Sequence, residues 1–195
     1  EVIQELGHGG MAWVYRAKDS ETGEIVAVKV LMPELTAQPA FIKRFHREVE
    51  TLRGLEHQCI VGVRDVGHEG LYHYYVMEYM DGPNLESIMR ASETSVTVSQ
   101  ALEFTRSIAE ALQHAHGAGI IHRDIKPANI MTDLAGNVKL TDFGIAKDVD
   151  ATRLTVTGGI VGTADYMSPE QAEGKRVTRK SDLYSLGVCM YEMLT

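Results

Sequence analysis

The chain has 195 residues, of which 44% are hydrophobic and 24% charged, and its formal net charge is −8. Such a composition is globular and long enough for one sizeable domain or two small lobes. The acidic balance, without any Lys- or Arg-rich run, argues against nucleic-acid binding through a basic surface. Cys59 and Cys189 are far apart and form no C-x-x-C pattern, which argues against a disulfide framework or zinc site and fits a reducing, cytoplasmic setting. We find no signal-peptide pattern and no apolar run of bilayer-spanning length.

A glycine-rich segment, residues 6–14, is the first feature along the chain. Residues 14–17 and 24–31 are rich in β-branched side chains with a turn between them, so we expect the glycines to lie among antiparallel strands. A Rossmann loop would open a helix, and a Walker loop would end in Gly-Lys-Ser/Thr. Glycines let backbone N–H groups approach phosphate oxygens closely. An ordinary glycine-rich hairpin is the alternative that this segment alone leaves open.

Two charged residues fall on otherwise apolar faces. Strand alternation places Lys29 on the apolar face of run 24–31. Residues 33–55 have helical period, and Glu48 falls on their apolar stripe. That stripe is Phe41, Phe45, Leu52 and Leu55. Because a buried charge needs a partner, we expect Lys29 and Glu48 to form an ion pair. The alternative is that each reaches water along its own apolar stem.

The remaining elements follow from the same patterns. We expect strands at 60–66, 71–80, 130–132 and 138–141, and helices at 84–90, 100–116 and 181–194. Ser99 is the expected N-cap of the helix at 100–116. The expected buried stripe of that helix is Leu102, Ile108, Leu112 and Ala115. His114 and His116 lack metal-ligand partners at a suitable spacing and are interpreted as surface or loop residues.

Side chains that can hold a proton, a phosphate or a metal are concentrated in residues 120–129, where Asp124, Lys126 and Asn129 fall close together. A second acidic loop, Asp142-Phe143-Gly144, follows the strand at 138–141. Carboxylate and amide oxygens are the hard ligands that Mg²⁺ prefers, and a further Asp can accept a hydroxyl proton. Metal holders, a positive charge and a proton acceptor are the groups that phosphoryl transfer needs. The loop therefore predicts a phosphoryl-transfer site.

Six motifs occur in an order that resembles the protein kinase signature set. They are Gly7-x-Gly9-x-x-Ala12-x-Val14, Val26-Ala27-Val28-Lys29, Glu48, His122-Arg123-Asp124-x-Lys126-x-x-Asn129, Asp142-Phe143-Gly144 and Ser168-Pro169-Glu170. The Gly-Gly-Met-Ala glycine loop and the run 162–172 resemble the bacterial Ser/Thr kinases of eukaryotic type. The resemblance implies an α+β, two-lobed protein kinase fold. It implies an N-lobe at 1–80, a small antiparallel sheet with one helix, and a partial, mostly helical C-lobe at 81–195.

The resemblance also implies roles for single residues, with ATP and Mg²⁺ as cofactors. Asp124 would orient the acceptor hydroxyl and take its proton, and Lys126 would stabilise the transferred phosphoryl group. Asn129 and Asp142 would hold Mg²⁺. Asp182 would brace the backbone of the catalytic loop.

In the N-lobe, Lys29 would hold the α- and β-phosphates and be positioned by Glu48. Ala27 and Met131 would sandwich the adenine, while Met77 would gate the pocket behind it. The backbones of Glu78 and Met80 would bind the adenine edge. The full set implied to bind ATP is Leu6, Gly7, His8, Gly9, Gly10, Met11, Ala12, Trp13, Val14, Ala27, Lys29, Met77, Glu78, Met80, Met131 and Asp142.

Regulation and partners follow from the same resemblance. Arg123 is a docking point for a phosphorylated residue, and we expect autophosphorylation at Thr155 and Thr157, with a merely polar, flexible loop as the alternative. The expected partner is a protein with a Ser or Thr acceptor, and dimerisation would serve autophosphorylation. We expect a cytoplasmic location, or the cytoplasmic face of a membrane if the full-length protein is anchored.

The sequence departs from the family pattern at Ala12, which replaces a glycine, and at Ser168, which replaces an alanine. The chain is expected to cover only part of the family's domain, leaving Glu170 without its usual arginine and the helix at 181–194 with an exposed apolar face. The alternative function is therefore a nucleotide-binding, catalytically weak kinase-like fragment that acts as a binding or regulatory module.

Overall fold

The structure is a computed structural model that describes residues 1–91, 96–144 and 164–195. The chain divides into two compact units, the first made of residues 1–56 and 61–80 and the second of residues 57–60 and 81–195. Each unit has its own buried apolar core. Within the described ranges, no helix is both long and apolar enough to cross a bilayer.

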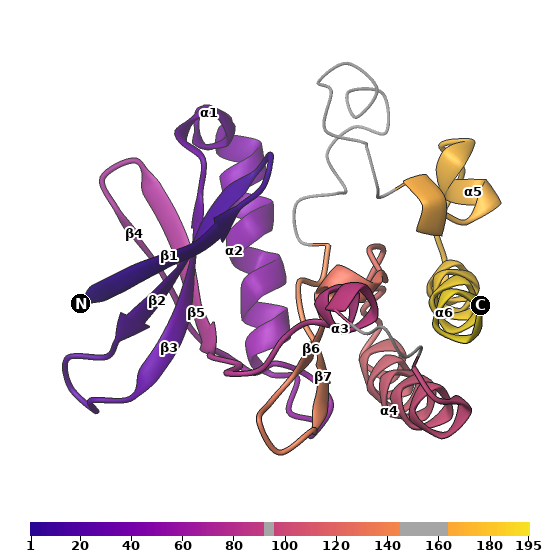
Figure 1. Cartoon of the computed structure of the whole chain (residues 1–195). Helices are drawn as coiled ribbons and strands as arrows, with labels where there is room; N and C mark the ends of the chain where they lie inside the picture. Colours follow the sequence, from indigo (N-terminus) through magenta and orange to yellow (C-terminus); the bar gives the residue numbers. More distant parts are fainter. Residues whose placement is uncertain (92–95, 145–163) are drawn as a thin grey trace. The chain divides into compact units, whose positions relative to one another are not determined.

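The first unit is built on a five-stranded antiparallel sheet of order β1-β2-β3-β5-β4 (Figure 1). Its strands are β1 (Val2–His8), β2 (Ala12–Lys18), β3 (Ile25–Leu31), β4 (Val63–Glu69) and β5 (Tyr72–Glu78). Strand β4 begins at Val63 rather than at the expected Ile60. Ile60 instead forms a parallel bridge with Leu140 in the second unit.

Two helices, α1 (Pro33–Thr36) and α2 (Pro39–Arg53), replace the single helix expected at 33–55. The prediction was wrong because Pro39 cannot continue a preceding helix, and Gln38 before it has an extended backbone (φ −107°, ψ 106°). Helix α2 buries an apolar stripe: Phe41, Phe45, Val49 and Leu52. The Phe45 ring lies 6.2 Å from that of Tyr75 in β5, so α2 packs on one face of the sheet.

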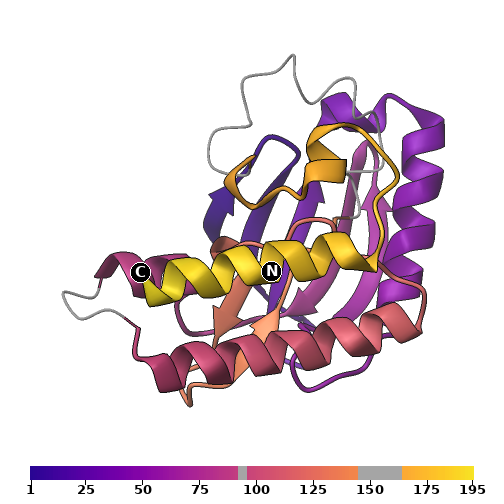
Figure 2. The same ribbon diagram turned by 90° about the vertical axis from the view of Figure 1, so that its right-hand side faces the viewer.

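The second unit is mainly helical around a short hairpin. Its helices are α3 (Leu85–Ala91), α4 (Val98–Gly117), α5 (Pro169–Ala172) and α6 (Arg179–Leu194), with 3-10 turns η1 (Pro127–Asn129) and η2 (Ala164–Tyr166). Figure 2 shows α4 and α6 lying side by side. The hairpin pairs β6 (Ile130–Thr132) with β7 (Val138–Leu140). It is fastened to the unit where the Leu140 N–H donates to the Cys59 carbonyl and the Thr132 N–H donates to the Pro83 carbonyl.

Helix α4 corrects two predictions. Its N-cap is Thr97, not Ser99: the Gln100 N–H donates to Thr97 Oγ1 (3.3 Å), and the Thr97 N–H donates to Gln100 Oε1 (3.0 Å). This reciprocal capping box satisfies two N-terminal donors at once. Ile108, Leu112 and Ala115 are buried as expected, but Leu102 is 53% exposed, and Ala101 and Ala111 complete the buried stripe.

Candidate active site

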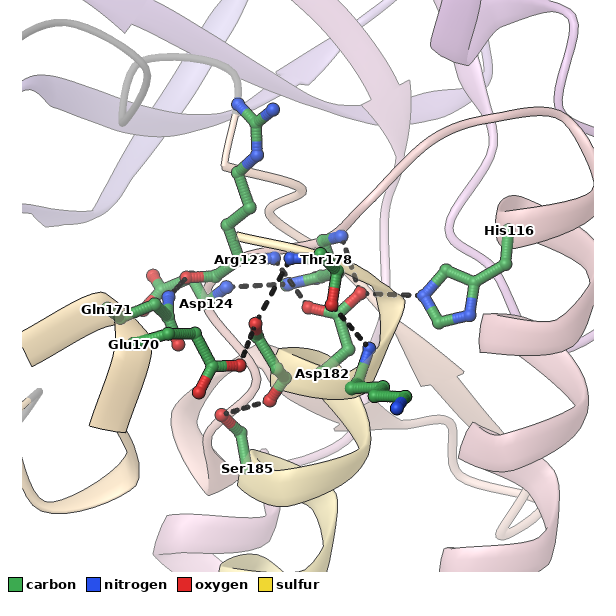
Figure 3. A network of polar contacts seen from close by, with 11 residues as sticks. His116, Arg123, Asp124, Glu170, Gln171, Thr178, Asp182 and Ser185 are labelled. Carbon is green, nitrogen blue, oxygen red and sulfur yellow. Dashed lines mark hydrogen bonds and ion pairs between the residues drawn. The ribbon is translucent and has the colours of Figure 1, made fainter. Parts of the chain in front are cut away.

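The backbone of the catalytic loop is held by a buried carboxylate from α6. Asp182 Oδ2 accepts the N–H of His122 and Asp182 Oδ1 accepts the N–H of Arg123, both at 2.8 Å (Figure 3). The Asp182 side chain is 1% exposed, so these bonds are shielded from competing water. The predicted bracing of the loop by Asp182 is confirmed.

Asp182 has a third partner that the sequence reasoning missed. His116, expected as a surface or loop residue, contacts Asp182 Oδ2 through Nε2 at 2.8 Å, and its side chain is only 10% exposed. His116 lies in the last turn of α4 and Asp182 in the first turn of α6, so the contact joins the two helices. The available signal was the position of His116 near the end of an amphipathic helix. Its partner could not be found from the local sequence because it is 66 residues away.

His122 is the buried centre of the loop. Its Nε2 donates to the Thr141 carbonyl (2.9 Å), and its Nδ1 accepts the Asp124 N–H (3.2 Å). Burial lowers the pKa of His122 below its usual value, outweighing the opposing effect of nearby carboxylates such as Asp182. A neutral ring is what these two bonds require, because one nitrogen donates and the other accepts.

Two residues of the site have left-handed backbone conformations. Arg123 has φ 68° and Asp142 has φ 59°, and in the described parts of the chain they alone are non-glycine residues with positive φ. Such conformations are uncommon outside glycine and persist where surrounding structure determines them. They lie directly before Asp124 and directly before Phe143, so the strain is confined to the two loops that the motifs single out.

Asp124, Lys126 and Asn129 lie together, as their spacing predicted. Asn129 Nδ2 donates to Asp124 Oδ2 (3.1 Å) and to the Asp124 carbonyl (2.8 Å), while Lys126 Nζ lies 3.5 Å from Asp124 Oδ2. The Asp124 side chain is 11% exposed. Since both bonds from Asn129 use its amide nitrogen, the orientation of the amide is fixed and Oδ1 remains as its ligand atom.

Backbone bonds connect this loop to the Asp142 segment. The Thr141 N–H donates to the Asn129 carbonyl (3.0 Å) and the Gly144 N–H donates to the His122 carbonyl (2.9 Å). Asn129 is therefore joined to the residue directly before Asp142. The described residues contain no group of three or more His, Cys, Asp or Glu side chains that could hold a metal. An Asn oxygen with one carboxylate nevertheless fits Mg²⁺, which often takes one or two protein carboxylates together with substrate phosphates.

In the first unit, the strand register gathers the expected nucleotide residues on one face of the sheet. Val14 lies opposite Lys29, and Ala27 lies opposite Met77. Residues directly opposite one another share a face, and alternation puts Ala27 and Lys29 on the same side of β3. One face of the sheet therefore presents a cation, Lys29, beside small and apolar side chains.

The glycine segment forms the tip of the hairpin between β1 and β2, closed by the Gly9 N–H donating to the Ala12 carbonyl at 2.9 Å. A Cβ added at Gly7, Gly9 or Gly10 would meet no described atom within 4 Å, and none of the three has positive φ. Neither the turn nor its packing requires glycine at these positions. This favours close approach of an external group over an ordinary glycine-rich hairpin.

The remaining predicted residues are placed as follows. Glu48 is half-buried on α2, Met77 and Glu78 end β5, and Met80 is buried just beyond it. Met131 is the central residue of β6 in the second unit, where it pairs with Lys139. The predicted phosphorylation sites, Thr155 and Thr157, lie outside the described residues.

Glu170 has a partner other than the arginine of the family pattern. Its Oε1 accepts a short hydrogen bond from Ser181 Oγ at the start of α6. This bond lowers the pKa of Glu170 below its usual value.

The comparisons with known proteins agree with this arrangement. The family model described as "Protein kinase domain" matches residues 1–195. The chain belongs to the protein kinase family. The expected α+β, two-lobed kinase fold is confirmed by the crystal structure of a cysteine-to-alanine mutant of the Mycobacterium tuberculosis PknI kinase domain. It is 30% identical, with a TM-score of 0.79, and the match covers 98% of this chain and 72% of that one.

Among the similar proteins are bacterial serine/threonine-protein kinases. The probable serine/threonine-protein kinase SCO3848 of Streptomyces coelicolor is 45% identical over 97% of this chain. Serine/threonine-protein kinase PrkC of Bacillus subtilis is 42% identical over 100% of it. This kinase chain spans 29% and 30% of the length of those two relatives. Membership of the family implies the use of ATP and Mg²⁺ in general terms.

Proposed function

We propose that this chain transfers the γ-phosphate of ATP to a serine or threonine hydroxyl of a protein. The observation that carries the proposal is the Asp124 carboxylate, held beside Lys126 and Asn129 in a loop whose backbone is fixed by Asp182. Phosphoryl transfer depends mainly on positioning and on charge neutralisation. A rigid loop that carries a carboxylate, an ammonium and an amide oxygen supplies both.

Each residue of the loop has a distinct task in this proposal. Asp124 Oδ2 accepts the hydroxyl proton of the acceptor and so orients its oxygen towards the phosphorus. The ammonium of Lys126, 3.5 Å from that carboxylate, neutralises charge on the transferred group. Asn129 Oδ1 and the Asp142 carboxylate would hold Mg²⁺, which would neutralise charge on the phosphate oxygens.

The first unit is proposed as the ATP-binding lobe. Lys29 faces the same side of the sheet as Tyr75, whose ring lies 6.2 Å from that of Phe45 in α2. Glu48 lies one turn after Phe45 on the same helix, which supports the proposed ion pair with Lys29. The hairpin tip at residues 7–10 has the open surroundings that close approach of phosphates requires.

The decisive experiment is transfer of labelled γ-phosphate from Mg-ATP to peptides that offer Ser, Thr or Tyr. We expect transfer to Ser and Thr, and a decrease in kcat of about 10²–10⁴-fold in Asp124→Asn, the usual contribution of a general base. Asp65→Asn, a matched change at an exposed site in β4, should leave the rate unchanged. Transfer unaffected by Asp124→Asn would contradict the proposal.

A melting experiment distinguishes the alternative function, a nucleotide-binding module without turnover. A ligand that binds only the native state raises stability by about 2.7 kcal/mol at 100 times its dissociation constant. A rise in melting temperature with Mg-ATP, lost in Lys29→Ala, combined with no phosphate transfer, would favour the binding module.

We also propose autophosphorylation at Thr155 and Thr157, read by Arg123. The Arg123 side chain points away from the network around Asp182 (Figure 3), although its own backbone is part of that network. A guanidinium directed away from a fixed backbone suits a phosphorylated partner. Phosphopeptide mapping after incubation with Mg-ATP tests the proposal, which fails if neither threonine carries phosphate.

A further inference from the structure

The short helix α5 contacts the catalytic loop through one side chain. Gln171 Nε2 donates to the backbone carbonyl of Arg123 at 3.0 Å, across 48 residues of sequence (Figure 3). The other end of the same amide is also used, since Gln171 Oε1 accepts from the N–H (3.1 Å) and the Oγ (3.0 Å) of Ser168. Ser168 is fully buried. The Gln171 amide is therefore fixed in orientation.

The carbonyl of Arg123 belongs to the peptide unit that precedes Asp124. The N–H of the same unit, that of Asp124, donates to His122 Nδ1 at 3.2 Å. Both ends of the peptide unit are thus held, one by Gln171 and one by His122. On its other side, Arg123 donates its own N–H to Asp182 Oδ1 at 2.8 Å. Rotation of this peptide unit, which would swing the Asp124 side chain, is opposed from two directions.

Helix α5 is itself anchored to the helix that supplies Asp182. Glu170 accepts from Ser181 Oγ at the start of α6, so neighbouring residues of α5 contact α6 and the catalytic loop. Arg123 needs this support more than most residues because its φ is 68°. A left-handed conformation outside glycine is retained only where the surroundings determine it.

We propose that Gln171 is a positioning residue for phosphoryl transfer: by holding the Arg123 carbonyl it fixes the peptide plane that orients the Asp124 carboxylate. The inference rests on the proposed role of Asp124 but names a residue outside the catalytic loop. Gln171 itself touches neither the acceptor nor the phosphate. Its effect is on the direction of the carboxylate that takes the proton.

The competing interpretation is that Gln171 only caps α5. Gln171→Glu separates the two, because Glu at this position of a capping box serves as well as Gln. The variant keeps the acceptor for Ser168 but replaces the N–H donor by an ionised oxygen facing the Arg123 carbonyl. Gln113→Glu, the same change at an exposed site of α4, is the matched control.

We expect kcat of Gln171→Glu to decrease by about 10- to 100-fold, as small misplacements of a reacting group do, with the KM for ATP and the melting temperature unchanged. Its kcat relative to the unmodified chain should recover as pH falls, because a protonated Glu regains a donor. A capping role alone predicts no such recovery. An unchanged kcat overturns the proposal. A decrease in kcat that is accounted for by a lower melting temperature also overturns it.

Amide hydrogen exchange of the Asp124 N–H tests the inference without any turnover. Exchange should be at least about tenfold faster in Gln171→Glu than in the unmodified chain or in Gln113→Glu, because the peptide unit loses one of its two supports. Equal rates overturn the positioning role. If the unmodified chain transfers no phosphate, the proposed function fails, while the exchange rates still decide whether Gln171 fixes the loop.

Discussion

The Asp182 carboxylate and the Arg123 amide are 2.8 Å apart although 59 residues separate them in sequence. The bond is buried at the carboxylate end, and it meets Arg123 where the backbone is left-handed. The geometry of the catalytic loop is therefore determined by the start of α6. Four testable consequences follow from contacts in the two units.

Replacing Asp182 by alanine should destabilise the fold strongly. The change leaves the buried N–H groups of His122 and Arg123 without their acceptor, at a cost of about 1–3 kcal/mol for each. Denaturant unfolding should show the decrease in free energy of unfolding. Lys180→Ala, at an exposed site in the same turn of α6, should change it by less than about 0.5 kcal/mol. Equal effects of the two variants would contradict the interpretation.

Stability should fall as the solution becomes mildly acidic. His122 has a folded-state pKa below its usual value of 6.5 because of burial, and His73 is shifted in the same direction, first by burial. The unfolded chain therefore binds more protons than the folded one, so the free energy of unfolding decreases as pH drops below about 6.5. Urea unfolding between pH 8 and pH 5.5 measures this, with a weaker dependence expected in His122→Asn. A stability that rises on acidification would disprove the assignment.

The N-cap of α4 can be decided by two alanine substitutions. Thr97→Ala removes the acceptor for the Gln100 N–H and should lower stability by about 1 kcal/mol, as the loss of an N-cap usually does. Ser99→Ala lies inside the helix, where alanine is favoured, and should be neutral or slightly stabilising. Thermal unfolding of both variants is the measurement. A larger loss of stability in Ser99→Ala than in Thr97→Ala would instead support Ser99 as the N-cap.

Gly82 is required by the close approach of another backbone segment. A Cβ at this position would lie 2.6 Å from the Thr132 carbonyl oxygen and 3.0 Å from the Asp133 carbonyl carbon. Gly82→Ala should therefore lower the free energy of unfolding by about 1–3 kcal/mol, since backbone must move to relieve the contact. Gly117→Ala, where a Cβ meets no described atom within 4 Å, is the control and should not destabilise. Equally small losses of stability in Gly82→Ala and Gly117→Ala would show that the backbone around Gly82 moves freely enough to accept a Cβ.

Local patterns were sufficient to predict most of the strands and the composition of the catalytic loop. β6 was predicted with its exact bounds, and Asp124, Lys126 and Asn129 were expected together because they are close in sequence. Predictions failed where a single residue overrides a pattern. Pro39 interrupts the helical period of 33–55, and the signal was present in the sequence.

Contacts between distant residues were predicted only where the family resemblance implied them, as for Asp182 and the catalytic loop. His116 was interpreted as a surface residue because its partner, Asp182, lies on another helix. The bond from Gln171 to the Arg123 carbonyl has no local signature, since its two ends are 48 residues apart in sequence. The left-handed conformations of Arg123 and Asp142 are likewise set by tertiary contacts, because neither residue type demands a positive φ.

The order of synthesis gives the Asp182 contact a temporal consequence. Residues are made from the N-terminus, so the catalytic loop leaves the ribosome 59 residues ahead of its brace. At about 5–20 residues per second the delay is about 3–12 s. Until Gln171 is made, 48 residues after Arg123, the loop has neither the acceptor from α6 nor the donor from α5 that hold the folded conformation of Arg123. The nascent chain therefore contains all the residues of the loop before the contacts that fix their arrangement can form.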